Sequence, residues 1–65
     1  TPVVVDDSML SESLAKIYIK QGKYAKALEI ITTISLKFPE KSIYFADQIR
    51  FLRKLVKTET LKNNK

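Results

Sequence analysis

Apolar residues recur at helical spacing on both sides of the single glycine of the chain. They form one stripe before Gly22, then another after it: Leu14, Ala15, Ile17 and Tyr18, then Tyr24, Ala27, Leu28, Ile31 and Ile34. This spacing is typical of amphipathic helices, which we expect at residues 9–21 and 24–37. Gly22 can adopt the left-handed conformation that closes a helix, whereas Pro39 cannot continue one. The two stripes should therefore face each other across a short turn.

The second helix carries more apolar residues than one partner helix can cover, so another element must pack on it. A further amphipathic pattern predicts a helix over 43–57, with Ser42 as its N-cap, while Ser8 or Ser11 should cap the first helix. The apolar residues of the third helix form two adjoining rows: Phe45, Ile49, Leu52 and Val56 in one, and Tyr44, Phe51 and Leu55 in the other. One row can cover the hairpin, and the other is left for solvent or a partner. The sequence thus predicts an all-α fold of three helices.

The ends of the chain lack such a pattern. We expect residues 1–7 to form an N-terminal extension, 8–41 the helical hairpin, 42–57 a capping helix and 58–65 a polar, basic tail. No apolar run approaches the roughly 20 residues of a membrane span, and Val3–Val5 is too short for a signal peptide. We therefore expect a soluble, cytoplasmic protein.

The spacing of these residues resembles the tetratricopeptide repeat (TPR) family. In that pattern a Leu and a small residue precede an aromatic residue, a glycine, a second aromatic residue, an alanine, a large apolar residue, a small residue and a proline. The residues at those places are Leu14, Ala15, Tyr18, Gly22, Tyr24, Ala27, Ile31, Ile34 and Pro39. The chain departs from the pattern at Ser11, Ala15 and Ile34, where a large ring, Gly and Ala are common. The alternative is a helical hairpin without repeat ancestry.

The resemblance spans residues 8–41 and continues into one more helix, as at the C-terminal end of small bacterial TPR proteins of undefined role. It implies a non-catalytic module that binds proteins in a groove lined by the first helix of each repeat. The groove residues would be Met9, Glu12, Lys16, Ile19 and Lys20 beside Ile43, Ala46, Arg50, Arg53 and Lys54. Such a groove is basic and favours acidic peptides. The family's clamp for a terminal carboxylate is not expected, because its Lys and Asn are here Glu12 and Lys16.

Charge is distributed unevenly along the chain. From Thr1 to Ile49 six lysines balance six carboxylates, whereas from Arg50 onward six basic residues face only Glu59, so the net charge of +5 lies in this last part. This favours an anionic partner. The alternative is a solvated helix end, because basic side chains there complement the helix dipole. Nucleic acid is not the anion we expect, since no aromatic residues interleave with the basic run to stack on bases.

Self-association is a second function that the sequence favours. One repeat and one helix fall short of the roughly three repeats that a stable stack needs. The row Tyr44, Phe51 and Leu55 has no predicted partner within the chain; a symmetric homodimer through the third helix, or an upstream repeat, would supply one. The chain has no Cys, no His and no phosphate-binding loop, so we expect no enzyme activity, metal site or cofactor.

Overall fold

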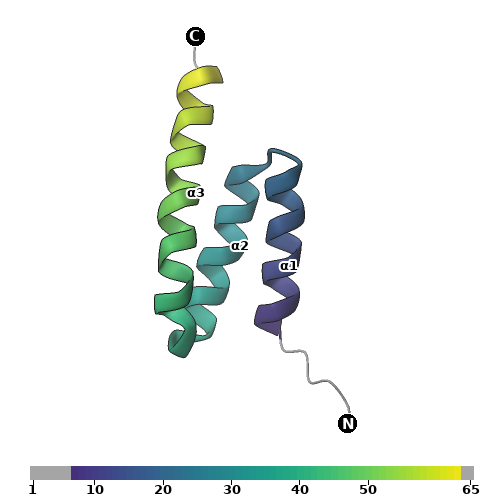
Figure 1. Ribbon diagram of the computed structural model, residues 1–65, viewed down its shortest axis with the longest axis vertical. Helices are drawn as coiled ribbons and strands as arrows, with labels where there is room; N and C mark the ends of the chain where they lie inside the picture. The colour runs from purple at the N-terminus through teal and green to yellow at the C-terminus, as the bar shows by residue number, and fades with distance from the viewer. Residues whose placement is uncertain (1–6, 64–65) are drawn as a thin grey trace.

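The protein folds into a row of helices in which the chain reverses direction twice. The computed structural model describes the backbone of residues 7–63 and the side chains of residues 7–59. Its elements are α1 (Asp7–Lys20), α2 (Tyr24–Lys37), a 3₁₀ turn η1 (Pro39–Lys41) and α3 (Ser42–Asn63). As Figure 1 shows, α1 and α3 run in the same direction and α2 runs back between them. The expected all-α fold of three helices is confirmed for the described residues.

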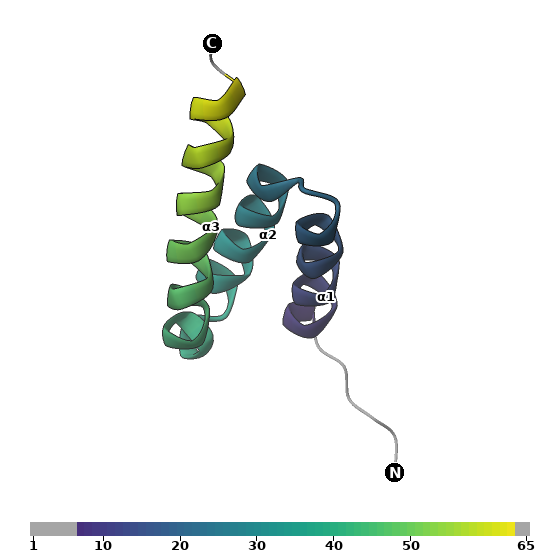
Figure 2. The ribbon, with the colours of Figure 1, turned by 45° about the horizontal axis from the view of Figure 1, so that its top comes forward.

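α2 is the helix on which both others pack. α1 and α3 both pack against α2, whereas no Cα atom of α1 lies within 8 Å of one in α3. Both views of the ribbon place α2 between its neighbours (Figures 1 and 2). All three helices contribute apolar side chains that are buried completely or nearly so: Ala15, Ala27, Ile31, Ile34, Phe45 and Leu52. The core is therefore centred on α2.

Small residues allow α1 and α2 to approach closely. Ala15 and Ala27 are both 0% exposed, and short side chains at a helix crossing shorten the distance between the axes. At the open end of this hairpin the Lys37 amine lies 3.3 Å from the Asp7 carboxylate. Both groups are largely exposed, so this ion pair contributes at most about 1 kcal/mol. Burial of apolar side chains, both alanines among them, therefore contributes more to this pairing than the ion pair does.

The turn between α1 and α2 closes at Gly22, as predicted. Gly22 has a φ of +76°. Its amide donates to the carbonyl of Ile19 at 3.0 Å, and the amide of Lys23 donates to the carbonyl of Tyr18 at 2.9 Å. This pair of bonds is the Schellman motif, which satisfies carbonyls that the end of a helix would leave unpaired. The left-handed conformation of the glycine makes both bonds reachable.

Pro39 ends α2 as predicted, but the predicted helix caps are wrong. Pro39–Lys41 form a 3₁₀ turn that leads directly into α3. Ser42 has helical dihedral angles, with φ −61° and ψ −36°, whereas an N-cap is extended. Ser8 and Ser11 lie inside α1 rather than before it. The chain therefore enters α3 through the 3₁₀ turn instead of a side-chain cap.

α3 is longer than predicted. It continues past residue 57 to Asn63, so residues 58–63 of the predicted tail are helical. With 22 residues against 14 in α2, it is about 33 Å long against about 21 Å, and its last turns project beyond the start of α2 (Figure 1). The expectations for residues 1–6 and for 64–65 lie outside the described residues.

The apolar stripe of α1 is turned relative to the prediction. Ala15 faces α2 and is buried, but Leu14 and Ile17 are 45% and 51% exposed. Tyr18 packs against the core as predicted, and Ile19, which was not in the predicted stripe, does so too. The physical reason is that α1 approaches α3 as well as α2, which turns its contact face toward the side that bears Ile19. Leu14 and Ile17 then share an exposed face with Leu10, which is 60% exposed.

Candidate interaction surface

Side chains, rather than close backbone contacts, connect α1 to α3. One oxygen of the Glu12 carboxylate accepts a hydrogen bond from the Tyr44 hydroxyl at 2.8 Å and another from the Gln48 side-chain amide at 3.0 Å. One turn earlier, the Lys41 amine donates to the Ser8 hydroxyl at 2.6 Å. Ser8 is 1% exposed, so this bond satisfies a buried hydroxyl. Together these bonds connect the first half of α1 to η1 and to the first half of α3.

The same bonds define the register of the two helices. The two bonds between α1 and α3 join residues that are 32 and 36 positions apart. A residue of α1 therefore lies beside the α3 residue about 34 positions later, and 34 residues is the length of one TPR unit. Helical periodicity could not predict the contacts themselves, because it describes one helix at a time.

Glu12 changes the acidity of the tyrosine that it binds. The hydrogen bond to Glu12 raises the pKa of Tyr44 above its ordinary value of 10.0, and the negative charge of the carboxylate and some desolvation act in the same direction. The hydrogen bond with Gln48 acts against them. The net effect keeps the phenol protonated, so that it remains a donor.

Four of the predicted partner-binding residues are on α1. Glu12, Lys16 and Lys20 follow one another by single turns and share a face, which Ile19 borders. Lys16 and Lys20 are exposed, and Ile19 is half-buried against the core. Glu12 contacts α3 as described, so the open part of this face is formed by the two lysines.

The remaining predicted partner-binding residues, Arg50, Arg53 and Lys54, are on α3 and are exposed. The Arg50 guanidinium lies 2.6 Å from the Asp47 carboxylate, with the two side chains 71% and 86% exposed. Arg50 and Lys54 share a face, one turn apart. They follow Lys16 and Lys20 by 34 positions each, which is the register of the two helices.

The second apolar row of α3 is divided between core and surface. Leu55 packs against the core. The Tyr44 ring meets the Phe45 ring edge-on, with centroids 4.9 Å apart, while its hydroxyl binds Glu12. Leu55 and Tyr44 thus have partners within the chain, contrary to the prediction. Phe51 and Tyr44 are 58% and 59% exposed, so these two members of the row still offer surface to a partner.

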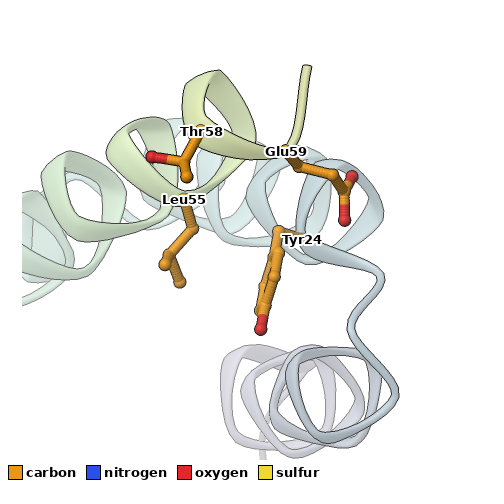
Figure 3. A pocket seen from close by; sticks show the side chains of 4 residues that line it. All are labelled: Tyr24, Leu55, Thr58 and Glu59. Carbon is orange, nitrogen blue, oxygen red and sulfur yellow. The ribbon is translucent and has the colours of Figure 1, made fainter. Parts of the chain in front are cut away.

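A small pocket lies where α3 passes the start of α2. It has a volume of about 260 Å³ and is lined by Tyr24, Leu55, Thr58 and Glu59. In Figure 3 the Tyr24 and Leu55 side chains point to the same side, and the Glu59 carboxylate lies beside the start of α2. The pocket results from the extra length of α3. Sequence reasoning missed it because the prediction ended the helix at residue 57.

Comparison with known proteins adds no relative. A scan against family models and searches of curated proteins and of solved structures gave no match, so the TPR resemblance stays a prediction. The described residues hold no cluster of three or more acidic side chains that could bind a metal ion. None of the described helices combines the length and the apolar character that crossing a membrane requires.

Proposed function

We propose that this chain is a non-catalytic, TPR-like protein-binding module with a basic groove that favours acidic peptide segments. The observation that carries the proposal is the pairing of the parallel helices α1 and α3 through bonds between residues 32 and 36 positions apart, which is about one TPR length. In the TPR family, helices at these two positions line the groove that holds a partner. The resemblance of residues 8–41 to the TPR pattern supports the same interpretation.

The charge of the two helices supports an acidic partner. Lys16 and Lys20 on α1 and Arg50 and Lys54 on α3 are exposed, and each can pair with a carboxylate of an extended peptide. Arg50 can do so with two parallel hydrogen bonds. Its present partner Asp47 is itself highly exposed, so exchanging that carboxylate for one on a peptide costs little.

Nuclear magnetic resonance titration of the labelled chain with an acidic peptide tests this proposal. We expect saturable amide shifts along α1 and α3, including Lys16 and Arg50, that weaken as salt is added. The double variant Lys16→Glu/Arg50→Glu should lose them. Lys26→Glu, which changes an exposed lysine of α2, is the matched control and should bind like the unaltered chain.

The outcome that contradicts the proposal is also specific. Shifts that cluster on α2, at Glu29, Thr32 and Thr33, would place the peptide on another surface. A loss of binding in Lys26→Glu as large as in the double variant would mean that net charge, rather than a groove, attracts the peptide.

Self-association is a second candidate function, and the exposure of Phe51 favours it. A phenylalanine that is 58% exposed leaves much of its apolar surface in water. Burial of that surface would stabilise a dimer by up to about 1–2 kcal/mol. Tyr44, 59% exposed, lies two turns away on the same helix. A homodimer through this part of α3 would also double the number of groove-forming helices.

A further inference from the structure

The pocket between α2 and α3 differs in chemistry from the basic faces of the helices. Tyr24 contributes an aromatic ring and Leu55 an aliphatic side chain. The Thr58 hydroxyl donates to the carbonyl of Lys54 at 2.9 Å, so it is already used within α3. The Glu59 carboxylate is the charged group among the lining side chains.

The size of the pocket limits what it can hold. Sites for small molecules usually measure about 300–1,000 Å³, and this one measures about 260 Å³ and is open to solvent. It therefore suits one long side chain of a partner rather than a whole small molecule.

The carboxylate of Glu59 determines whether the pocket favours an apolar or a cationic side chain of a partner. It is half-buried and has no hydrogen bond or ion pair with any residue whose side chain the structure describes. An apolar group seated in the pocket would cover this carboxylate without replacing its water, which is unfavourable. A cationic group would pair with it, while the stem of the same side chain would pack on Leu55.

We infer that this pocket binds a single arginine side chain of a partner protein. The planar guanidinium can donate two parallel hydrogen bonds to Glu59 and stack on the Tyr24 ring. The ammonium of lysine is a point charge that cannot make both contacts equally well. This site differs from the acidic-peptide groove in both place and charge, so it does not rest on the proposed function.

The net charge of the protein determines how much charge a suitable probe peptide can carry. Because the chain carries +5 overall, its long-range field repels cations, and the pocket acts only through short-range contacts. A probe with a single positive charge is therefore suitable: the capped tripeptide acetyl-Ala-Arg-Ala-amide. Its counterpart with citrulline in place of arginine has nearly the same shape and no charge.

Titration of the labelled, unaltered chain with each tripeptide, followed by amide shifts, tests the inference. We expect the arginine peptide to shift the amides of Tyr24, Leu55, Thr58 and Glu59 and to bind at least tenfold more tightly than the citrulline peptide. Glu59→Gln should lower the affinity for the arginine peptide by at least tenfold. Glu29→Gln, at an exposed position of α2, is the control and should change nothing.

Several results would overturn the inference. They are equal affinity for the two tripeptides, unchanged binding by Glu59→Gln, or shifts remote from the pocket. Circular dichroism establishes whether Glu59→Gln is folded. If that variant does not fold, the comparison of arginine with citrulline on the unaltered chain still decides. Failure of the acidic-peptide titration leaves this result untouched, because the two probes address different residues.

Discussion

Ala27 of α2 is a small residue that is completely buried in the core, as is Ala15 of α1. It is 0% exposed, so Ala27→Leu must push the helices apart, and we expect a loss of about 1–3 kcal/mol in unfolding free energy. Ala25→Leu is the matched control, since it makes the same change at an exposed position in the same turn; its effect should stay within about 0.5 kcal/mol. Urea denaturation followed by circular dichroism measures both. Equal midpoints for the two variants would mean that the crossing is not tightly packed.

Phe45 and Phe51 are chemically identical residues of α3 in opposite environments, 1% and 58% exposed. Phe45→Ala should cost about 3–5 kcal/mol, which is a large part of the about 3–10 kcal/mol expected for a chain of this length. Phe51→Ala should cost less than about 0.5 kcal/mol in the monomer. Thermal and urea denaturation at low protein concentration compare the two. A similar loss for both would show that the Phe51 ring is buried in solution.

Tyr44 links the pH of the solution to the contact between α1 and α3. Its pKa is raised above 10.0 by Glu12, so the folded value exceeds the unfolded one. The stability that this contact contributes is complete below pH 10 and is lost as the pH rises through the folded pKa. We expect Glu12→Gln to lower the pKa of Tyr44 toward its ordinary value. A titration of tyrosine labelled with ¹³C resolves the individual rings; an unchanged Tyr44 pKa in this variant, as in the control Glu29→Gln, would contradict the assignment.

Among the elements, the turn at Gly22 depends on one backbone conformation. A Cβ atom added to Gly22 would meet no atom within 4 Å, so the cost of a side chain there is conformational and not steric. With φ at +76°, Gly22→Ala should lose about 1–2 kcal/mol, and Gly22→Asn should lose less, because Asn tolerates this region. Urea denaturation ranks the three proteins. An alanine variant as stable as the unaltered chain would mean that the turn can close in another way.

The elements also show how far sequence reasoning reaches. Periodicity predicted each helix, and Gly22 and Pro39 predicted both breaks, because these signals are local. It placed Leu14 on the wrong side of α1, since the face that a helix buries depends on where its neighbours lie. It also ended α3 at residue 57, directly after the last apolar residue of its stripe, whereas residues 58–63, which are polar apart from Leu61, contain no Gly or Pro and continue the helix.

Prediction from the sequence had different limits for the candidate sites. The sequence singled out the exposed basic residues of α1 and α3, but it could not predict the contact of Glu12 with Tyr44 and Gln48. That contact depends on the register of two helices that are not neighbours in the chain. The pocket at Tyr24 depends on the unequal lengths of α2 and α3. Tertiary geometry, and not residue type, produces both features.

At the scale of the whole molecule, two of the exposed apolar surfaces among the described residues are candidates for joining copies of the chain. One is Phe51 on α3, and the other is the α1 face with Leu10, Leu14 and Ile17. We expect a dimer through α3, so Phe51→Glu should reduce the mass measured by light scattering to that of one chain. Leu14→Glu is the control and should leave the mass unchanged. If only the Leu14 variant dissociates, the interface is on α1; if the unaltered chain is monomeric at all concentrations tested, the proposal of self-association fails.

The position of α2 between its neighbours determines how quickly, and in what order, the chain can fold. The close backbone contacts between helices all join α2 to the helix before or after it in sequence, so folding closes only short loops. Helical proteins with such local contacts fold in roughly microseconds to milliseconds. Either α1 or α3 can dock first, but each needs α2 to dock on.

Temperature-jump kinetics can test this order with two buried residues, Ile31 of α2 and Leu52 of α3, each 1% exposed. Ile31→Val should slow folding, because both routes use α2. Leu52→Val should mainly speed unfolding, since chains that dock α1 first do not need the contacts of Leu52 in the transition state. Equal effects of the two variants on the folding rate would exclude parallel routes. If the two variants behave as expected, α2 is the helix that must form on either folding route.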